Sequence, residues 1–339
     1  MSIPPIDSTM PGAGGGAGAG AGVGGGNVGG DNAGGGIEVD HVSRSFGEVQ
    51  AVRDASLTAA PGTVTALIGP NGSGKTTLLL MLASLLKPDA GTIRIAGHDP
   101  NADPTAVRAR LGWMPDVLGS WAALTVRATL QTTGRLYRMD ATTAAVRAAE
   151  LLVLVGLSDL ADQPTRVLSR GQKQRLSLGR ALVHNPDVLL LDEPASGLDP
   201  AARIDLRHLV RRIASEGKTV LISSHVLAEL DEMADTAVYL EKGVTASAER
   251  IASTRRTSRM WRIRASSTQA LEAALVASGF ALDEIVADRN ELLVALAGEA
   301  AAAELLAQLV AGGIQVSTFA PAVGDLEHTF LDLSKGTDQ

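Results

Sequence analysis

The sequence lacks several residue types and patterns, and each absence excludes a kind of chemistry. It contains no cysteine, which excludes disulfide bonds, thiolate metal sites and a cysteine nucleophile, and which agrees with a reducing cytoplasm. Its longest apolar runs, such as LLLMLASLL at 78–86, fall far below the roughly 18–20 residues that span a bilayer. Any role at a membrane therefore requires a partner.

Charge and histidine usage argue against two further functions. The formal net charge is −7, so no overall basic field is present to hold a nucleic-acid backbone, which leaves room only for a local basic groove. We therefore expect no nucleic-acid partner. The six histidines, at 41, 98, 184, 208, 225 and 328, are scattered without the spacing of metal ligands, so we expect no transition-metal site.

Composition divides the 339 residues, a length that suits about two domains. Residues 1–36 hold 15 of the 37 glycines and few residues that could bury apolar surface, which predicts a flexible, disordered tail. The tail has neither the basic nor the apolar region of a signal peptide. The rest separates into 37–250 and 258–335, joined by the polar segment ERIASTRRTSR near 250–259.

The first segment alternates strands and helices. Strands are predicted at IEVDHVSRSFG, AVRDASLTAAPG, TVTALIG (63–69), DVLLLDEP and TVLISS (219–224). Helices are predicted from Lys75 to Leu86, over much of 111–187, and over 201–216, with Gly217 as a C-cap and with one apolar face formed by Ile204, Leu206, Leu209, Val210 and Ile213. This alternation predicts an α/β fold with a mostly parallel sheet and helices on both faces.

The second segment has a different order. MWRIRA, a helical TQALEAALVAS, FALDEIV, ELLVALA, a helical AAAELLAQLV and IQVSTF follow one another, which is the βαββαβ order of a ferredoxin-like domain. No catalytic group of residues accompanies it. We interpret 258–335 as a small α+β accessory domain with an interaction or regulatory role.

A phosphate-binding loop, GPNGSGKTT, follows the strand at 63–69 and leads into a helix. Glycines at 69, 72 and 74 allow backbone N–H groups to approach phosphates, and the helix adds its positive N-terminal end. Lys75 supplies a charge for the β- and γ-phosphate oxygens, and the Thr76 hydroxyl suits Mg²⁺. The candidate ATP site is thus Gly69, Pro70, Asn71, Gly72, Ser73, Gly74, Lys75, Thr76 and Thr77.

Two carboxylates end the buried strand in VLLLDEP at 188–194. Adjacent acids at such a position are unfavourable unless a cation or a polar ligand receives them. We expect Asp192 to hold Mg²⁺ directly or through water, and Glu193 to polarise the attacking water.

LSRGQ at 168–172, SGLDP at 196–200 and His225 complete the ordered set. Together with the loop and the acids, over about 37–245, they resemble the nucleotide-binding subunit of an ABC transporter. The resemblance implies an ABC-type phosphate-loop ATPase domain with a helical subdomain, which pairs head to tail with a second such domain, here as a homodimer, around two ATP molecules. It implies that Ser169, Gly171 and Gln172 lie at the partner's γ-phosphate and that Asp199 couples the two sites. It also implies that His225 is the switch histidine at the γ-phosphate and that Phe46 stacks on adenine.

Asp116 departs from the pattern, because most family members have Gln at this position. It precedes a segment, 117–130, that resembles the surface receiving the membrane subunit. A carboxylate here should either tighten Mg²⁺ binding or sit back from the metal.

Three functions compete on this basis. The leading one is an ATP-hydrolysing subunit at the cytoplasmic face of the cell membrane that powers a separate permease, similar to the ATPases of drug, polysaccharide or lipid exporters. Soluble ABC ATPases that act on ribosomes or DNA resemble duplicated domains or domains split by a coiled coil, and neither is seen. A GTPase or kinase is disfavoured because no N-K-x-D segment is present and LSRGQ would have no role.

Overall fold

The computed structural model describes residues 35–117, 119, 121–224, 226–247, 251 and 258–335. Three predictions fall wholly or mostly outside these described residues: the Gly-rich tail up to residue 34, His225, and most of the linker near 250–259.

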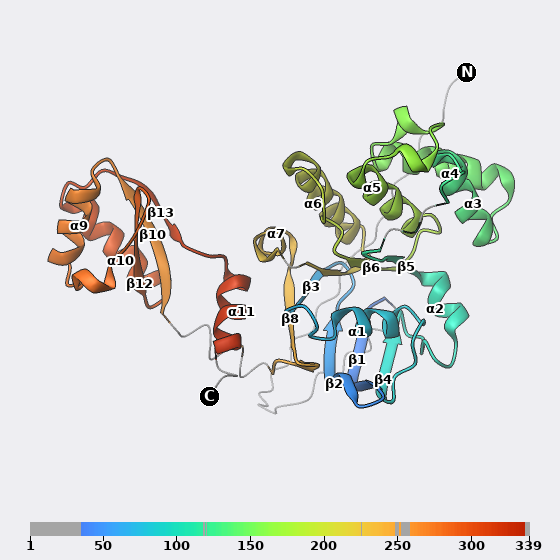
Figure 1. The fold of residues 1–339 in the computed structure, drawn as a ribbon, viewed down its shortest axis with the longest axis horizontal. Coiled ribbons are helices and arrows are strands. Elements are labelled where there is room, and N and C mark those ends of the chain that lie inside the picture. Colours follow the sequence, from blue (N-terminus) through green and yellow to red (C-terminus); the bar gives the residue numbers. More distant parts are fainter. Residues whose placement is uncertain are drawn as a thin grey trace, which may run out of the picture. The chain divides into compact units, whose positions relative to one another are not determined.

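The first sheet has nine strands in the order β4-β1-β2-β9-β8-β3-β7-β6-β5 (Figure 1). Their bounds are β1 Ile37–Phe46, β2 Val49–Ala59, β3 Val64–Ile68, β4 Ala90–Ile95, β5 Leu111–Met114, β6 Val188–Asp192, β7 Thr219–Ser223, β8 Thr236–Glu241 and β9 Val244–Thr245. Strands β5, β6, β7, β3 and β8 are parallel neighbours, as expected, whereas β1 pairs antiparallel with both β2 and β4.

The sheet is therefore mixed, and the prediction of a mostly parallel sheet holds only for one part of it. For β1 and β2 the cause is their short connection, where Gly47 has a φ of 60°. A tight turn can join antiparallel strands, but parallel strands need a longer crossover.

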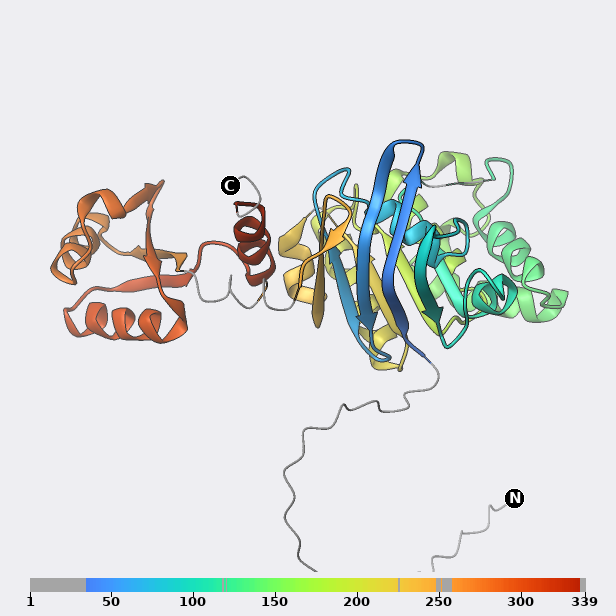
Figure 2. The ribbon, with the colours of Figure 1, turned by 90° about the horizontal axis from the view of Figure 1, so that it is seen from below.

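Helix α1 (Lys75–Leu82) lies between the antiparallel strands and the parallel strands of this sheet (Figures 1 and 2). Its side chains Leu78, Leu79, Met81 and Leu82 are fully buried in one apolar cluster with residues of β1, β2, β4 and β6. The burial of these four side chains fixes α1 against the strands, and this fixes the loop that joins β3 to α1.

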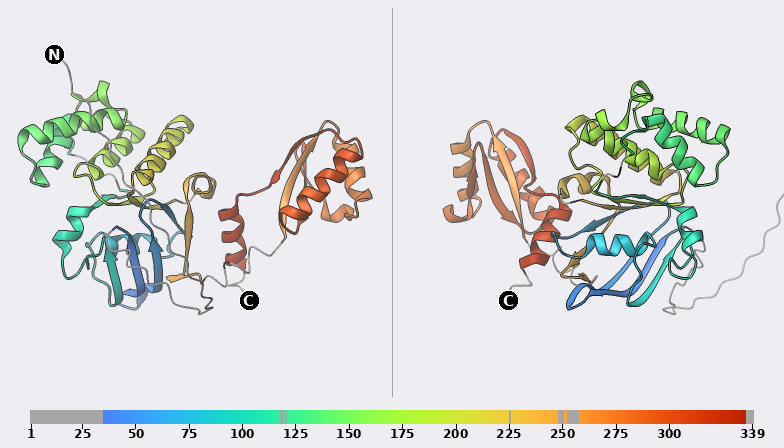
Figure 3. Two further views of the ribbon diagram at one scale, coloured as in Figure 1. Left: turned by 180° about the vertical axis from the view of Figure 1, so that it is seen from behind. Right: turned by 45° about the vertical axis from the view of Figure 1, so that its right-hand side comes forward.

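A group of helices follows between 104 and 181: α2 Pro104–Arg110, α3 Val126–Leu136, α4 Ala141–Leu154 and α5 Arg170–Ala181, with 3₁₀ turns at Ser158–Leu160 and Thr165–Val167 (Figure 3). The side chains of Thr125, Asp140 and Ser169 each accept a hydrogen bond from a backbone N–H at the start of α3, α4 and α5. Such caps satisfy donors that a helix cannot pair internally. The mostly helical pattern predicted for 111–187 is confirmed.

Helices α6 (Pro200–Ser215) and α7 (Leu227–Met233) come after β6 and β7. On α6, Leu206, Val210 and Ile213 are buried as predicted, but Ile204 is 46% exposed. Residues two apart on a helix point about 200° from each other, so Ile204 and Leu206 cannot share one narrow face. The prediction for Ile204 was wrong.

A second sheet has the order β11-β12-β10-β13, with all neighbours antiparallel. It comprises β10 Arg259–Ala265, β11 Val286–Asp288, β12 Glu291–Leu296 and β13 Val316–Pro321, with α9 Thr268–Ala277 and α10 Gly298–Ala311. The strand expected at FALDEIV begins only at its last residue, Val286, and is preceded by a 3₁₀ turn, Leu282–Glu284, where Glu284 accepts a hydrogen bond from the N–H of Ala281. This local bond favours a turn over a strand.

The final helix, α11 (Asp325–Lys335), packs on α7 and β8 of the first sheet. Leu326, Phe330 and Leu333 join the same apolar cluster as Met233 and other residues of the first domain. The N–H of Leu326 also donates to Asp231 Oδ1 at 2.8 Å. Although α11 follows β13, its apolar contacts are with the first core.

Candidate active site

The loop between β3 and α1 is tightly closed. Lys75 Nζ donates hydrogen bonds to the carbonyl oxygens of Gly69 at 2.6 Å and Pro70 at 3.1 Å. A Cβ atom at position 69 would lie 2.2 Å from the carbonyl oxygen of Leu240 and 2.5 Å from Ser73 Oγ. Only glycine fits there, because no side chain tolerates such distances.

The loop also presents free donors. Within the described residues, the backbone N–H groups of Gly72, Gly74, Lys75, Thr76 and Thr77 have no hydrogen-bond acceptor, and no side chain caps α1. Such donors at a helix N-terminus bind anions, and phosphate oxygens are suitable acceptors. The loop therefore fits the phosphates of a nucleotide.

Lys75 faces two carboxylates across the site. Burial lowers the pKa of its ammonium group, and the negative charges of Glu193 and Asp192 oppose that change. The side chain is held by loop carbonyls, so its charge stays close to the donors of the loop. One cation and two anions thus lie close enough beside the start of α1 for the carboxylates to affect the pKa of the lysine.

Asp192 is 5% exposed and accepts a hydrogen bond of 2.6 Å from Ser223 Oγ. The two residues are register partners on β6 and β7. Burial raises the pKa of Asp192; the Ser223 bond lowers it, while the charges of Glu193 and Asp116 raise it further. The sequence predicts Ser223 only as part of a strand, because its pairing with Asp192 depends on the register of β6 and β7.

Glu193 has an unusual backbone and several anchors. Its φ is 51°, in the left-handed region that non-glycine residues rarely adopt. Its N–H lies 3.2 Å from both the carbonyl oxygen and Oγ of Ser223, and its carbonyl oxygen accepts a bond of 2.9 Å from Gln174 Nε2. Gln174 is 2% exposed and lies on α5. A lone polar residue within a helix gave no sequence signal for this contact.

The LSRGQ and SGLDP segments lie against each other. Ser169 Oγ accepts from the N–H of Gln172 at 3.2 Å, and Gln172 Oε1 accepts from the N–H of Ser169 at 2.9 Å, which makes a capping box at the start of α5. Arg170 Nη2 donates to Ser196 Oγ at 2.7 Å, and a Cβ at Gly171 would lie 3.2 Å from Leu198. The structure thus brings the two segments together.

Asp199 caps the next helix, α6. Its Oδ1 accepts a hydrogen bond of 2.9 Å from the N–H of Ala202, and bonds from backbone N–H groups lower the pKa of its carboxyl group. The exposed Asp199 is therefore an ionised helix cap in this chain.

The oxygen types at this site suit Mg²⁺. The exposed Thr76 supplies a hydroxyl and the buried Asp192 a carboxylate, both hard oxygen donors. Among the described residues, no group of three or more His, Asp or Glu side chains gathers into a metal site. Mg²⁺ would therefore need phosphate and water oxygens to complete its shell, which agrees with its usual coordination beside nucleotides.

Two further candidates from the sequence are Phe46 and His225, and the structure describes only Phe46. Phe46, at the end of β1, is 49% exposed, and the guanidinium of Arg44 lies 5.0 Å from its ring centre. The ring is available for stacking. His225 lies outside the described residues.

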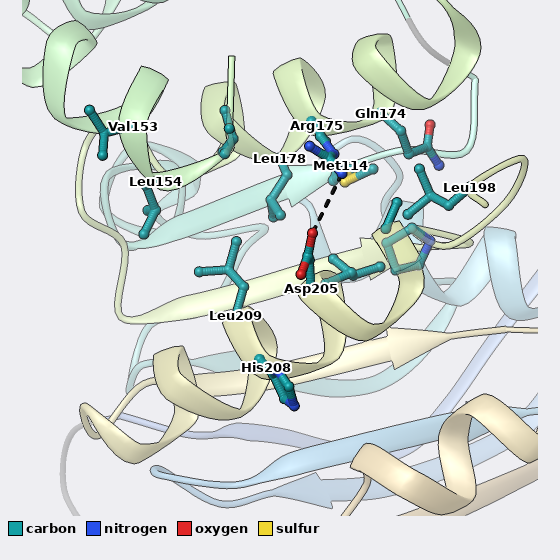
Figure 4. A pocket seen from close by; sticks show the side chains of 15 residues that line it. Met114, Val153, Leu154, Gln174, Arg175, Leu178, Leu198, Asp205, His208 and Leu209 are labelled. Atoms are coloured by element: carbon teal, nitrogen blue, oxygen red, sulfur yellow. Dashed lines mark ion pairs between the residues drawn. The ribbon is translucent and has the colours of Figure 1, made fainter. Parts of the chain in front are cut away.

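A cavity of about 280 Å³ separates α5 from α6 (Figure 4). Its wall is largely apolar, with Leu178 on α5 and Leu209 on α6, and Arg175 and Asp205 form an ion pair of 3.7 Å across it. Gln174, which bonds Glu193, also lines it. None of its lining residues belongs to the phosphate loop.

Comparison with known proteins places these features in a family. The model of the family described as ABC transporter matches residues 52–196. The daunorubicin resistance ATP-binding protein DrrA3 of Streptomyces coeruleorubidus is 40% identical over 61% of this chain and 66% of its own length. The Nod factor export ATP-binding protein I of Paraburkholderia xenovorans is 40% identical over 61% of this chain and 68% of its own length. The chain thus spans about two thirds of the length of these curated relatives.

A solved structure is also similar. It is a dimeric ATP-binding cassette in a post-hydrolysis state with ADP and Pi bound, 25% identical, with a TM-score of 0.58, and the match covers 62% of this chain and 97% of that one. Together with the family match over residues 52–196, this likeness confirms the ABC ATPase fold.

Proposed function

The chain belongs to the ATP-binding proteins of ABC transporters, a family of transport ATPases, and from this premise we propose that it hydrolyses ATP to power an exporter whose permease is a separate protein. The observation that carries the proposal is the meeting of the Lys75 ammonium with the carboxylates of Asp192 and Glu193 beside a loop of free N–H donors. The names of two relatives, which refer to drug resistance and to Nod factor export, support the direction of transport.

ATP would be held by the loop from Gly69 to Thr77, with Lys75 on the β- and γ-phosphates and Phe46 against adenine. Thr76 and Asp192 would hold Mg²⁺, which neutralises phosphate charge when it is bound. Glu193 would accept a proton from the attacking water, and its anchored backbone limits where its carboxylate can reach. His225 would contact the γ-phosphate.

We further propose that two copies form a head-to-tail dimer with ATP at composite sites. Ser169, Gly171, Gln172 and Asp199 would serve the nucleotide bound by the other copy. The similar dimeric cassette with ADP and Pi supports this assembly. The bond from Arg170 to Ser196 supports it as well, because it presents both segments as one rigid surface.

A groove of about 430 Å³ offers a docking surface for the permease. It is lined by exposed apolar side chains, including Leu85, Val117 and Leu136, and by the guanidinium groups of Arg108 and Arg180. A short amphipathic segment with an apolar face would fill it. Within the described residues, no helix is both long and apolar enough to cross a bilayer. The proposed location is therefore the cytoplasmic face of the membrane, through the permease.

Residues 258–335 are proposed to be a ferredoxin-like accessory domain, attached to the nucleotide-binding domain of 37–250. Support comes from the β-α-β-β-α-β element order and from the fully antiparallel strand order β11-β12-β10-β13. Its last helix, α11, contacts the first domain, so the accessory domain has a direct route to influence it.

The substitution Glu193→Gln tests the central proposal. We expect ATP binding to persist and turnover to fall about 10²-fold, because the amide cannot accept the proton of the water. The control is Glu150→Gln, which removes a carboxylate of a surface ion pair with Arg147. ATP binding and steady-state hydrolysis would be measured for both. Turnover of the Glu193 variant within a few-fold of the control would reject Glu193 as the catalytic carboxylate.

A further inference from the structure

Arg203, in the first turn of α6, contacts two different elements. Its Nε donates a hydrogen bond of 3.1 Å to the carbonyl oxygen of Leu198, in the SGLDP segment. Its Nη1 lies 2.9 Å from Oε1 of Glu229, on α7. One planar guanidinium group therefore joins the segment before α6 to the helix that follows β7.

The surroundings of the ion pair between Arg203 and Glu229 exclude much of the water. The side chain of Glu229 is only 15% exposed, and that of Arg203 is 42% exposed. A carboxylate that is mostly removed from water needs a partner, so Glu229 holds the partly exposed guanidinium of Arg203 in a defined position. Along the chain, Glu229 follows His225 by four residues, and Leu198 immediately precedes Asp199.

Two similar ion pairs further along the same helix have no such second contact. Arg207 pairs with Glu232, and Arg211 pairs with Asp235 at 2.9 Å. Within the described residues, neither arginine bonds the 196–200 segment. Arg207 and Arg211 lie on the same helix as Arg203, carry the same charge and also pair with a carboxylate. They therefore serve as controls: a variant of either arginine shows the effect of losing an ion pair on stability, without the effect of losing the Leu198 contact.

The 196–200 segment has a second anchor on its other side, where Arg170 of α5 bonds Ser196. Removing the Arg203 contact would leave the segment bonded to α5 through Arg170 and to its own helix through the Asp199 cap, without this contact to α7. Asp199 would then be held less firmly relative to α7. Small displacements of this kind reduce turnover more than they reduce binding, because reaction requires alignment that binding does not.

We propose that Arg203 is a positioning residue that couples the Asp199 segment to α7, so that Asp199 keeps a fixed place relative to the helix that follows β7. The proposal rests on the ATPase function given above. We assign Arg203 itself no contact with nucleotide or metal. It acts through Leu198 and Glu229.

The test is Arg203→Lys, compared with Arg207→Lys in the full-length protein. Lysine keeps the charge, so both variants should fold with melting temperatures close to wild type. A single ammonium group cannot reproduce the two-sided guanidinium contact. We expect kcat of the Arg203 variant to fall about tenfold with little change in the Kd for ATP, whereas kcat of the Arg207 variant stays within twofold of wild type.

Glu229→Gln provides an independent measurement. It should lower kcat in the same way, and the double variant with Arg203→Lys should lose less than the product of the two single effects, because both act through one contact. Equal kcat values for Arg203→Lys and Arg207→Lys, in a wild type that hydrolyses ATP, would overturn the inference alone. An inactive wild type would overturn the proposed function and this inference with it.

Discussion

Ser223 Oγ lies 2.6 Å from Oδ1 of Asp192 and donates a hydrogen bond to a carboxylate that is almost completely buried. The bond stabilises the ionised form of Asp192, which is the form that can bind a cation, against a burial effect that raises the pKa.

Ser223→Ala should therefore raise the pKa of Asp192 further. As pH falls, the variant would lose the ionised carboxylate, and with it ATPase activity, at a higher pH than wild type does. Profiles of kcat/KM between pH 5 and 8 would show this shift of the acid limb. Thr219→Val is the control, because Thr219 begins the same strand and bonds Gly35 instead. Coinciding acid limbs for wild type and Ser223→Ala would contradict the assigned role of the bond.

The proposed composite site predicts complementation between two inactive variants. Lys75→Ala removes the loop charge, and Ser169→Ala removes the hydroxyl of the opposite surface. A 1:1 mixture of the two should recover about a quarter of wild-type turnover, because half of the dimers then contain one intact site of two. Hydrolysis by mixtures would be measured against each variant alone. A mixture no more active than its components argues against sites shared between two chains.

The position of Asp116 leads to a prediction that distinguishes ATP hydrolysis by the isolated subunit from stimulation of that hydrolysis by the permease. Its side chain is exposed, and its charge reaches Asp192 weakly, as a minor contribution to the raised pKa. We expect Asp116→Asn to leave the turnover of the isolated subunit near normal and to reduce stimulation by the permease. A Mg²⁺ titration with and without permease tests this. A large rise in the Mg²⁺ needed for half-maximal turnover of the isolated subunit would instead make Asp116 part of the metal shell.

The burial of His184 predicts that the stability of the folded protein decreases as pH falls. Its ring stacks on Tyr137 with 3.8 Å between centroids, and burial lowers its pKa to about 4. The unfolded chain binds a proton near pH 6.5, so the unfolded state gains protons first as pH falls. The contribution of neutral His184 to stability is complete above pH 6.5 and is lost as pH falls from there towards 4. Melting temperatures should therefore fall less steeply between pH 7 and 5 in His184→Gln than in wild type. Parallel curves would refute this.

The contact of α11 with the first core predicts a stability effect far from the ATP site. Leu333 is 4% exposed, so Leu333→Ala should cost about 2–4 kcal/mol of unfolding free energy. Val310→Ala, at a position that is 58% exposed on α10, serves as the control and should change little. Equal denaturation midpoints for the two variants would mean that α11 contributes nothing to the stability of the first domain.

Features that depend on neighbouring residues in the chain were predictable. The phosphate loop, the acids at the end of β6 and the Ser169 cap each follow from a short run of residue types, because the interactions are local. The βαββαβ order of the second segment follows from periodicity in the same way.

Contacts between distant segments could not be predicted in this way. The bond from Gln174 to Glu193 and that from Ser223 to Asp192 require the packing of α5 and the register of β6 on β7. The contact of α11 with α7 also joins segments that lie far apart in the chain. A single sequence carries no information about which strands and helices become neighbours.

In the capping box at Ser169, the hydroxyl oxygen accepts one hydrogen bond while the hydroxyl proton remains able to donate another. Towards α5 the oxygen is an acceptor for the N–H of Gln172, so its own proton stays available for a phosphate oxygen, and accepting one bond strengthens the other. An aspartate would cap the helix equally well but would bring negative charge and no proton to that phosphate. In the dimer proposed above, a chain with aspartate at position 169 would keep the helix cap and lose the proton offered to the partner's phosphate, so it would fold normally and fail in ATP hydrolysis.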